Sequence, residues 1–517
     1  MSLLDDFHVK NGQKTGLSGI PTVRFDEFSR VVTESVRAGH RLVALFGMPR
    51  SAVSGIDSEP AEVLRLFAVL AHEAVGALHI LGTGLFQATY PAITPACTQA
   101  HMFEREIAEQ WGVVPEGHPW LKPVRFHMSH VPGRDAWGRT SRAEIAPGGC
   151  DFFRVEGEEV HEVAVGPVHA GIIEPGHFRF QCHGEQVLHL EIALGYQHRG
   201  VEPALVGGPD KRTIHYFQTL AGDTTVGHTL AYCETVEALA DCRVLARAHA
   251  LRGIALELER LANHTGDLGA LAGDVGYLPT ASYCGRLRGD FLNMTALLCG
   301  SRFGRGLLQP GGVAFDVDDA LVAELRRRLD LTLRDVEQAT DLLWNTSSVR
   351  ARFENTGHVP PEIAEALGLV GVAARACGLN RDVRHDFPSG IYRFAHIPVS
   401  TAETGDVFAR SLVRWLEIQR SATFIREQLA SLPSGPVSAR CGGLAPNSVA
   451  VTLVEGWRGE ICHVAITDGT GRFARYKIVD PSFHNWTGLA MAMRNQQISD
   501  FPLCNKSFNL SYCGFDL

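Results

Sequence analysis

The sequence lacks several patterns that would each identify a class of protein. Its twelve cysteines are scattered singly with no C-x-x-C, which excludes a zinc ribbon or an iron–sulfur run of the usual spacing within this chain. No Walker or GxGxxG pattern surrounds the glycine pair at 311–312, so we expect no bound nucleotide. The most apolar stretch, residues 64–86, is broken by His72, Glu73 and His79 and is therefore not a membrane span.

An excess of basic residues is also missing. Lys and Arg number 48 against 57 Asp and Glu, giving a formal charge of -9, which argues against a nucleic-acid partner. With 45% hydrophobic and 20% charged residues, the 517-residue chain has the composition of a folded protein, and at about 150 residues per domain it has room for two to four domains. The first residues have neither the basic nor the apolar region of a secretory signal, so we expect a cytoplasmic protein.

The N-terminal region, positions 1–165, alternates short strand-like and helical patterns. We expect strands at 41–48 and 84–89, and helices at 58–77 and 96–111. The following segment, 129–149, is rich in Pro, Gly, Arg and Ser and is typical of a loop or linker.

The pattern changes at Gly166. Alternation through Phe178–Cys182 and again through Leu188–Leu194 predicts a β-hairpin with one buried face. Long helical patterns then dominate. Further helices are expected around 251–261 and at 320–343, 361–377 and 405–429, and strands of a small sheet at 448–452, 461–467 and 473–479.

Several motifs resemble known families when taken together. Two segments near the front, Glu104–Gly112 and Glu116–Pro119, resemble the thirty-kilodalton subunit of respiratory complex I. The later motifs resemble both the forty-nine-kilodalton subunit of complex I and the large subunit of membrane-bound nickel–iron hydrogenases. They are Gly166–His169, Glu174–Phe180, Gly195–Glu202, Glu259–His264, Gly405–Arg414 and Asp480–Trp486. Both modules in one chain is the arrangement of the formate hydrogenlyase and hydrogenase-4 large subunits.

This resemblance implies an α+β fold with two domains. A small α/β domain over residues 1–165 would precede a mainly helical, hydrogenase-like domain with a small β-sheet over 166–517. It also implies an oxidoreductase subunit of the NADH dehydrogenase (quinone) type. That subunit would pack against an iron–sulfur subunit that resembles the twenty-kilodalton subunit of complex I, and it would rest on membrane-arm subunits at the cytoplasmic face of the membrane.

Hydrogenases of this family hold nickel and iron with four cysteine thiolates, because soft sulfur ligands bind and bridge such metals. The resemblance places those four positions on Ala221, Thr224, Ser511 and Gly514. Cys513 is one position away, and a single thiolate cannot hold a binuclear centre. We therefore expect no metal and no cofactor on this chain. The iron–sulfur cluster would lie in the partner subunit, and a quinone is a candidate acceptor.

Three residues are candidates for the acceptor site. Tyr232 aligns with the complex I tyrosine that hydrogen-bonds the quinone head group, and a phenol can donate to a carbonyl oxygen. The alternative for Tyr232 is a core residue. His169 matches the first histidine of the complex I loop, whereas Pro175 falls nearest the second, and His177 fits the hydrogenase pattern better. For both histidines, a loop histidine bonded to backbone is an equal alternative.

Three further residues are candidates for contact with the partner's cluster or with the vacated metal pocket: His198, Arg199 and His228. A local ion pair with Glu202 is the alternative for His198 and Arg199. Asp223 could relay protons, but we favour a helix N-cap because Asp-Thr-Thr precedes a helical run. The Glu104–Glu106 run is expected to be structural, at a subunit interface or in an internal ion pair.

The sequence thus predicts a catalytic-arm subunit of a complex I-like oxidoreductase that shapes a quinone-type acceptor cavity and couples electron transfer to ion translocation. The alternative is a non-catalytic scaffold or coupling subunit of a hydrogenase-related complex. An active hydrogenase is the least favoured reading. Packing around Tyr232 discriminates the first two, since an open polar pocket favours an acceptor and a filled one favours a scaffold.

Overall fold

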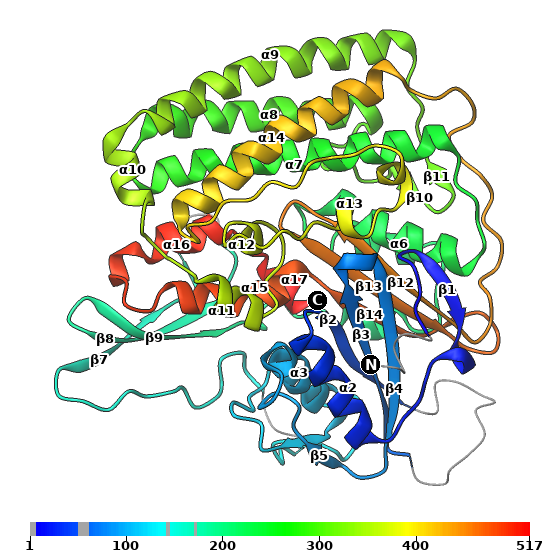
Figure 1. Cartoon of the computed structure of the whole chain (residues 1–517), viewed down its shortest axis with the longest axis vertical. Coiled ribbons are helices and arrows are strands. Elements are labelled where there is room, and N and C mark those ends of the chain that lie inside the picture. Colours follow the sequence, from blue (N-terminus) through cyan, green and yellow to red (C-terminus); the bar gives the residue numbers. More distant parts are fainter. Residues whose placement is uncertain (1–6, 50–61, 141–144, 170–172) are drawn as a thin grey trace.

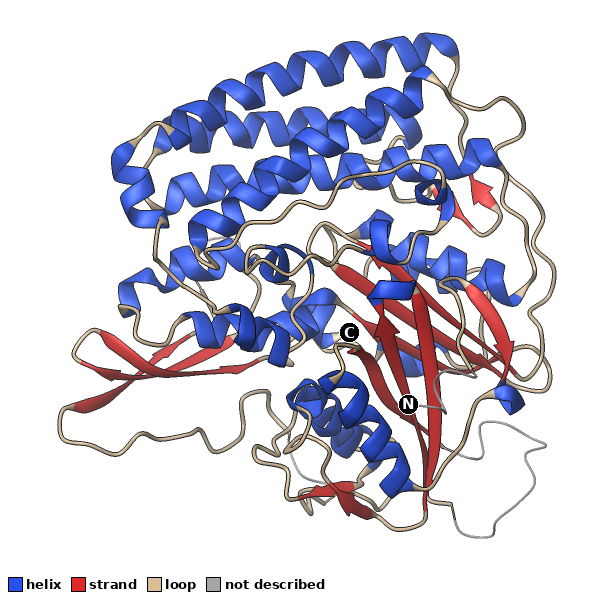
Figure 2. Ribbon diagram, viewed as in Figure 1, coloured by secondary structure: helices blue, strands red, loops and turns tan. Residues whose placement is uncertain are grey.

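The computed structural model describes residues 7–49, 62–140, 145–169 and 173–517. Helices and small sheets are mixed, as expected for an α+β fold, with a layer of long helices on one side and the N-terminal part of the chain on the other (Figures 1 and 2). Within the described ranges, no helix is long and apolar enough to span a bilayer.

The N-terminal part is built on a three-stranded antiparallel sheet of β2 (Arg41–Met48), β3 (Leu64–His72) and β4 (Ala77–Leu85), in that order. Helix α2 (Phe25–Arg37) packs on all three strands, and α3 (His101–Trp111) packs on β2. The predicted strand at 41–48 and the helix ending at Trp111 are confirmed. The segment 129–149 contains no helix or strand in its described residues, as predicted.

The helix predicted at 58–77 is wrong where the structure describes it, because residues 64–72 form β3, the central strand of this sheet. A strand buried on both faces has a continuous apolar run, and such a run gives no alternation to separate it from a helix. The strand predicted at 84–89 is also misplaced. The chain leaves β4 at Leu85 and pairs again only in β5 (Thr89–Pro91), which lies parallel to β6 (Val114–Glu116).

A second sheet lies at the centre of the molecule, in the order β1 (Gln13–Gly16), β12 (Ser448–Glu455), β13 (Glu460–Thr467) and β14 (Phe473–Val479). Its last three strands are fully buried and confirm the predicted C-terminal strands. Alternate side chains of β12 enter two different hydrophobic clusters. This sheet therefore separates a core shared with the N-terminal part from a core shared with the long helices.

The predicted hairpin is confirmed as β8 (His177–His183) and β9 (Gln186–Ala193), with β7 (Val160–Val165) added on the β8 edge. This three-stranded sheet projects from the body at the left of Figure 1. The pairing of β7 with β8 crosses the domain boundary proposed at residue 165, and that boundary stays a prediction.

Four long helices form the outer layer at the top of Figure 1: α7 (Ala246–Asp274), α8 (Leu278–Cys299), α9 (Asp319–Trp344) and α14 (Val407–Ala430). Of these, α7, α9 and α14 confirm predicted helices. The remaining predicted helix, at 361–377, is broken into α11 (Pro361–Ala366) and α12 (Gly371–Arg375). Gly368, between the two helices, and Gly371, the first residue of α12, adopt φ of +67° and +64°. A Cβ at Gly371 would lie 2.1 Å from the Arg458 carbonyl oxygen.

The remaining elements connect these layers. The helices are α4 (Val201–Leu205), α5 (Thr213–Gln218), α6 (Thr225–Leu239), α10 (Ser347–Phe353), α13 (Val383–Asp386), α15 (Pro481–Ala492), α16 (Phe501–Phe508) and α17 (Tyr512–Asp516), with a short ribbon of β10 (Leu308–Gln309) and β11 (Gly312–Val313). Single 3-10 turns occur at Leu17–Gly19, Glu73–Val75, Thr98–Ala100, Gly390–Arg393 and Ile498–Asp500.

Candidate functional site

The four positions assigned to metal ligands lie on two segments that the fold brings together. Ala221 and Thr224 lie in the turn between α5 and α6, and Ser511 and Gly514 lie at the start of α17. Arg199 joins the two segments, because its guanidinium donates to the carbonyls of Leu220 (2.8 Å) and Cys513 (3.2 Å). We call the place where these two segments meet the pocket, after the metal pocket that the resemblance implies there.

A bidentate ion pair occupies the α6 side of this pocket. Arg458 donates to both carboxylate oxygens of Asp223 at 2.6 and 2.8 Å, and also to the carbonyl of Asn509 at 2.5 Å. Burial alone would raise the pKa of Asp223. The charge and hydrogen bonds of Arg458 outweigh this effect, so the pKa of Asp223 is lowered. Asp223 is thus not the helix cap that its sequence context predicted. The N-cap of α6 is Thr224, whose side chain makes no capping bond.

The α17 side of the pocket has little room for a larger side chain. A Cβ at Gly514 would lie 2.6 Å from Oδ2 of Asp480 and 2.8 Å from Oγ of Ser511. The Ser511 hydroxyl oxygen accepts from the Gly514 amide and caps α17. Burial, followed by the neighbouring Glu174 carboxylate, raises the pKa of the Cys513 thiol to about 12, so this sulfur stays protonated at neutral pH.

A line of buried polar groups leads away from Asp480. His228 Nε2 lies 3.0 Å from Oδ2 of Asp480, and His228 Nδ1 lies 3.2 Å from Nε2 of His463. His463 Nδ1 lies in turn 3.1 Å from the Tyr476 hydroxyl. All four side chains are fully buried, and burial holds the pKa of His463 well below its ordinary value. We call these four residues the buried relay.

The protonation of the buried relay follows from its partners. With both rings neutral, Tyr476 donates to His463, His463 donates to His228, and His228 donates to the Asp480 carboxylate. Asp480 also accepts from the Ser482 amide at the start of α15. Burial opposes its ionisation, yet the hydrogen bond from His228 and the charge of Arg458 lower the pKa of Asp480. Such a line can pass a proton stepwise between Tyr476 and Asp480.

Glu259 is a second buried acid beside the pocket. Its carboxyl oxygens accept from the amides of Val226 (2.7 Å) and Gly227 (3.1 Å), which begin α6. Despite these bonds, burial raises the pKa of Glu259 to about 8, and the Asp223 charge adds to this. The group is therefore mainly protonated at neutral pH and titrates in a range where a catalyst can use it.

The candidate acceptor residues are not brought together with one another. Tyr232 is 3% exposed, its ring stacks on Phe217 with centroids 4.4 Å apart, and burial raises its pKa. His169 Nε2 lies 2.9 Å from the Gly176 carbonyl oxygen, and His177 Nδ1 lies 3.3 Å from that of Gly166. Both histidines thus close the base of their own loop.

Among the described residues, no hydrogen bond joins this loop to Tyr232. The contact between Tyr232 and the buried relay runs through Phe217, whose ring lies 5.1 Å from that of His463. His228, which the sequence analysis named as a candidate for the vacated metal pocket, is a member of the buried relay.

His198 and Arg199 lie at the edge of the pocket. His198 Nδ1 lies 2.7 Å from the Asp516 carbonyl oxygen, its ring stacks on His127 at 4.8 Å, and burial lowers its pKa to about 4. Neither residue forms the ion pair with Glu202 that was the alternative. Glu202 instead accepts from Arg475 at 2.8 Å and forms a salt bridge with Lys477 at 3.1 Å.

The Glu104–Glu106 run is structural, as expected. Glu104 accepts from the Thr94 amide and hydroxyl, and Glu106 pairs internally with Lys477 at 2.6 Å. Sequence reasoning missed Arg458, which lies in the turn between β12 and β13 outside any quoted motif, and His463, which lies in a strand as an isolated histidine. Asp480 had a usable signal, since it opens one of the quoted motifs.

Comparisons with known proteins agree with the sequence motifs. Residues 44–136 match the family described as "Respiratory-chain NADH dehydrogenase, 30 Kd subunit", and residues 274–445 and 441–516 match "Respiratory-chain NADH dehydrogenase, 49 Kd subunit".

Three curated relatives are similar over most of their length. Carbon monoxide-induced hydrogenase of Rhodospirillum rubrum is 31% identical over 353 residues, covering 68% of this chain and 97% of the relative. NADH-quinone oxidoreductase subunit 4 of Thermus thermophilus is 30% identical over 369 residues, covering 66% and 90%. Formate hydrogenlyase subunit 5 of Escherichia coli is 29% identical over 442 residues, covering 82% and 76%.

Proposed function

The chain belongs to the family of respiratory-chain NADH dehydrogenase forty-nine-kilodalton subunits and related hydrogenase large subunits, fused to a module of the thirty-kilodalton type, and from this premise we propose that it serves a complex I-like membrane oxidoreductase without holding nickel. In this role it forms the wall of an electron-acceptor site beside an iron–sulfur partner. The observation that carries the proposal is the Asp223–Arg458 ion pair in the former metal pocket.

The residues of the pocket do not fit a nickel–iron centre. Four thiolates are needed, and Ala221, Thr224, Ser511 and Gly514 supply none. The Arg458 guanidinium, paired with Asp223, donates to the Thr224 hydroxyl at 3.2 Å and so occupies one of these positions. Asp480 lies 2.6 Å from the position of a Cβ at residue 514. The Cys513 thiol stays protonated and is not a ligand at neutral pH.

The pocket is suited to handling protons. Reduction of a quinone consumes protons as well as electrons, so an acceptor site needs groups that can deliver them. Glu259, with its pKa of about 8, and the buried relay place such groups around the turn between α5 and α6. The charges of Asp223 and Arg458 balance one another beside this turn. Such a fixed pair can stabilise a change of charge on a bound acceptor without rearranging.

The exposed rim of the pocket supports a partner subunit. Val168 is 89% exposed and Ile173 is 40% exposed on the loop between β7 and β8, and apolar side chains of this kind are typical of a protein interface. The half-buried His198 and the exposed Arg199 lie next to the C-terminal α17. We propose that an iron–sulfur subunit covers this rim, that electrons arrive from its cluster, and that the complex rests on membrane-arm subunits at the cytoplasmic face.

A scaffold or coupling role without a substrate is the second candidate. It is favoured by the packing of Tyr232, which is 3% exposed and stacked on Phe217 rather than facing open space. A cavity of about 760 Å³ does occur, but it lies beyond the C-terminal half of α6, lined by Glu234, Glu237 and His249 among others. An acceptor site must then form with the partner's surface.

The test uses the intact complex purified without oxygen. We expect iron from the partner's clusters, nickel far below one per complex, no hydrogen-dependent dye reduction, and reduction of an added quinone. His228→Gln should slow quinone reduction at least tenfold at equal cluster content, whereas the control His189→Gln, outside the pocket, should not. Stoichiometric nickel with hydrogen oxidation would overturn the proposal, and equal turnover in H228Q would favour the scaffold.

A further inference from the structure

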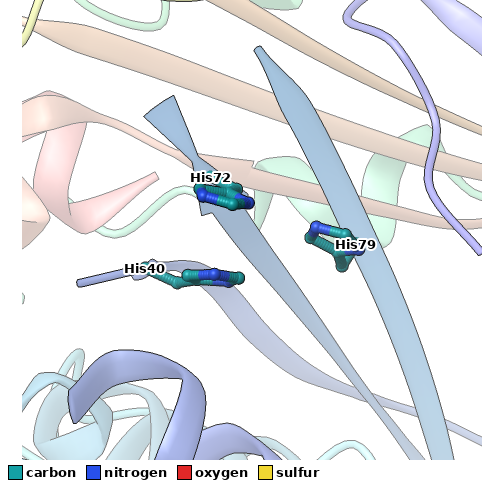
Figure 3. Close-up of side chains that lie close together, drawn as sticks. All are labelled: His40, His72 and His79. Atoms are coloured by element: carbon teal, nitrogen blue, oxygen red, sulfur yellow. The ribbon is translucent and has the colours of Figure 1, made fainter. Parts of the chain in front are cut away.

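Three histidines gather at one end of the N-terminal sheet, far in sequence and function from the pocket described above (Figure 3). His40 directly precedes β2, His72 is the last residue of β3, and His79 lies in β4. Each can offer a ring nitrogen, and these nitrogens lie within 4.8 Å of one another. We call these three residues the histidine cluster.

The strand register explains why the three rings share one face. Arg41 pairs with Ala71, so the preceding His40 stands opposite His72. His79 pairs with Leu70, which is two residues before His72 and therefore on the same face. Directly opposed and diagonal neighbours on one face of a sheet are within reach of long or aromatic side chains. The cluster is thus a product of the sheet itself and not of a loop.

The rings are close together in the structure. The centroids of His40 and His72 lie 4.1 Å apart with 22° between the ring planes, and those of His40 and His79 lie 5.6 Å apart. In a tetrahedral zinc site the ligand nitrogens are about 3.3 Å apart, given a Zn–N distance of about 2.0–2.1 Å. Rotations about the side-chain bonds of the three histidines would bring their ring nitrogens from within 4.8 Å of one another to the spacing of about 3.3 Å that zinc needs.

His79 is held in a tautomer that suits a ligand. Its Nδ1 lies 3.2 Å from the Phe7 carbonyl oxygen, which can only accept, so Nδ1 carries the proton and Nε2 keeps its lone pair. A histidine that donates its other N–H to a backbone carbonyl is the usual arrangement of metal-binding histidines. The 5% exposure of His79 further restricts its ring, while His40 and His72 are half-buried.

A route to the cluster and a balanced electrostatic setting are also present. A cavity of about 360 Å³ opens beside His72 and is lined by Gly39, Glu73 and Arg381 among others. The nearby charges balance, because Arg41 contacts Glu73 at 3.1 Å and Glu460 at 2.6 Å, and Arg381 lies 4.0 Å from Glu73. No excess of positive charge among these described groups opposes a cation.

We propose that His40, His72 and His79 bind a divalent transition-metal ion of the zinc class through three imidazole nitrogens. Neutral imidazole suits zinc, copper, nickel and iron, whereas magnesium and calcium prefer oxygen ligands. Three protein ligands leave a fourth position for water, on the side of the cavity that opens beside His72. The site is independent of the electron-transfer role, since it shares no residue with the pocket of Asp223.

The test titrates the full chain, stripped of metal by a chelator, with Zn²⁺ in calorimetry and with Co²⁺ in visible spectroscopy. We expect one zinc bound through the cluster and cobalt d–d bands without the intense near-ultraviolet band of thiolate ligation. His72→Gln and, separately, His40→Gln should weaken zinc binding at least about 100-fold, since removal of a ligand costs no less than removal of its hydrogen-bond partner.

Two controls make the result specific. His8 is exposed and stands opposite His79, because Val9 bridges to Leu78. The two rings lie 6.3 Å apart, yet His8 is not among the histidines whose nitrogens lie within 4.8 Å of one another. His8→Gln and the remote, exposed His161→Gln should keep zinc affinity within about threefold of the original chain. The metal-free variants are compared by melting temperature, so that loss of folding is separated from loss of a ligand.

Equal zinc affinity in the original chain, H40Q and H72Q would overturn the proposal. So would a cobalt spectrum dominated by thiolate bands that persist in those variants. A loss in H8Q as large as that in H72Q would overturn the assignment of these three ligands. None of these outcomes depends on electron-transfer activity, so a failure here is distinguishable from a failure of the proposed function.

Discussion

Two of the places where imidazole rings gather in the described chain, around His228 and around His72, are built differently. At the first, His228 and His463 are fully buried, and each ring nitrogen has a partner in a line that ends on Asp480 and Tyr476. At the second, the rings lie side by side at the end of a sheet, next to a cavity. Around His228, the paired ring nitrogens fix the position of each proton along the line. Around His72, the rings share one face of the sheet, so their nitrogens can turn toward one point.

The surroundings differ as well. The pocket beside His228 contains the fixed charges of Asp223 and Arg458, and the resemblance assigns its four ligand positions to Ala221, Thr224, Ser511 and Gly514. The histidine cluster offers imidazole nitrogens and has a balanced set of ion pairs nearby. If both proposals hold, the chemistry of the donors, and not the depth of the pocket, decides where this chain can hold a metal.

The largest expected effect comes from breaking the ion pair that fills the former metal pocket. Arg458→Met should lower the free energy of unfolding by about 2–4 kcal/mol, because it leaves Asp223 without its partner. We take less than the value for a fully buried pair, since the Asp223 side chain is 34% exposed and water screens it. Denaturant unfolding measures the change. The double variant D223N/R458M should recover part of the loss, and no recovery would show that the pair is not coupled.

The next effect tests whether the pocket has room for a ligand. Gly514→Cys should lower the free energy of unfolding by about 1–3 kcal/mol, because its Cβ would lie 2.6 Å from Oδ2 of Asp480. It should also bind no nickel by metal analysis. The control is Gly222→Ala, where a Cβ meets nothing within 4 Å. A stable G514C chain that acquires nickel would contradict the filled pocket.

A smaller effect is a pH dependence at Glu259. Its folded pKa, about 8, exceeds the value of about 4.3 for an unfolded chain, so the folded state binds the proton more tightly. The resulting stability is present below the unfolded pKa and is lost as the pH rises through about 8. Between pH 6.5 and pH 8 the original chain should lose about 1–2 kcal/mol more than Glu259→Gln, whose amide oxygen still accepts from α6. Parallel curves for the two chains would contradict this assignment.

The smallest expected change in stability is at Tyr232. Tyr232→Phe keeps the ring that stacks on Phe217 and removes one hydroxyl, so stability should change by less than about 1 kcal/mol. If the acceptor site reaches this residue, quinone reduction per cluster should fall up to about tenfold, the cost of one hydrogen bond. Unchanged turnover in the assembled complex would remove Tyr232 from the site and favour the scaffold role.

Local patterns were sufficient to predict elements whose faces differ in polarity. The hairpin over Phe178 and Leu190 and the amphipathic helix around Leu258 were found this way. The method failed where burial is uniform, as in β3, because an apolar run such as Leu64–Ala71 has no period to detect. It also failed at Gly368 and Gly371, whose left-handed backbone interrupts an otherwise helical pattern.

The candidate site was predictable only in outline. Motifs led to the turn containing Thr224 and to the C-terminal segment, and the structure brings both to one pocket. Arg458 and His463 could not be found from the sequence, because neither lies in a motif and both reach the pocket by strand pairing across β12–β14. The histidine cluster was hidden for the same reason, since a register aligns its members and register is a long-range property.

The edge strand β1 has a consequence for how the protein is made. Asn11, just before it, donates to the Leu453 carbonyl, a partner 442 positions further along the chain. At about 5–20 residues per second, a ribosome needs roughly 20–90 s to synthesise that interval. During this time the N-terminal strand has no sheet to join, and afterwards β12 has an open edge until β1 arrives. The pairing of β1 with β12 therefore cannot form until most of the chain has been synthesised.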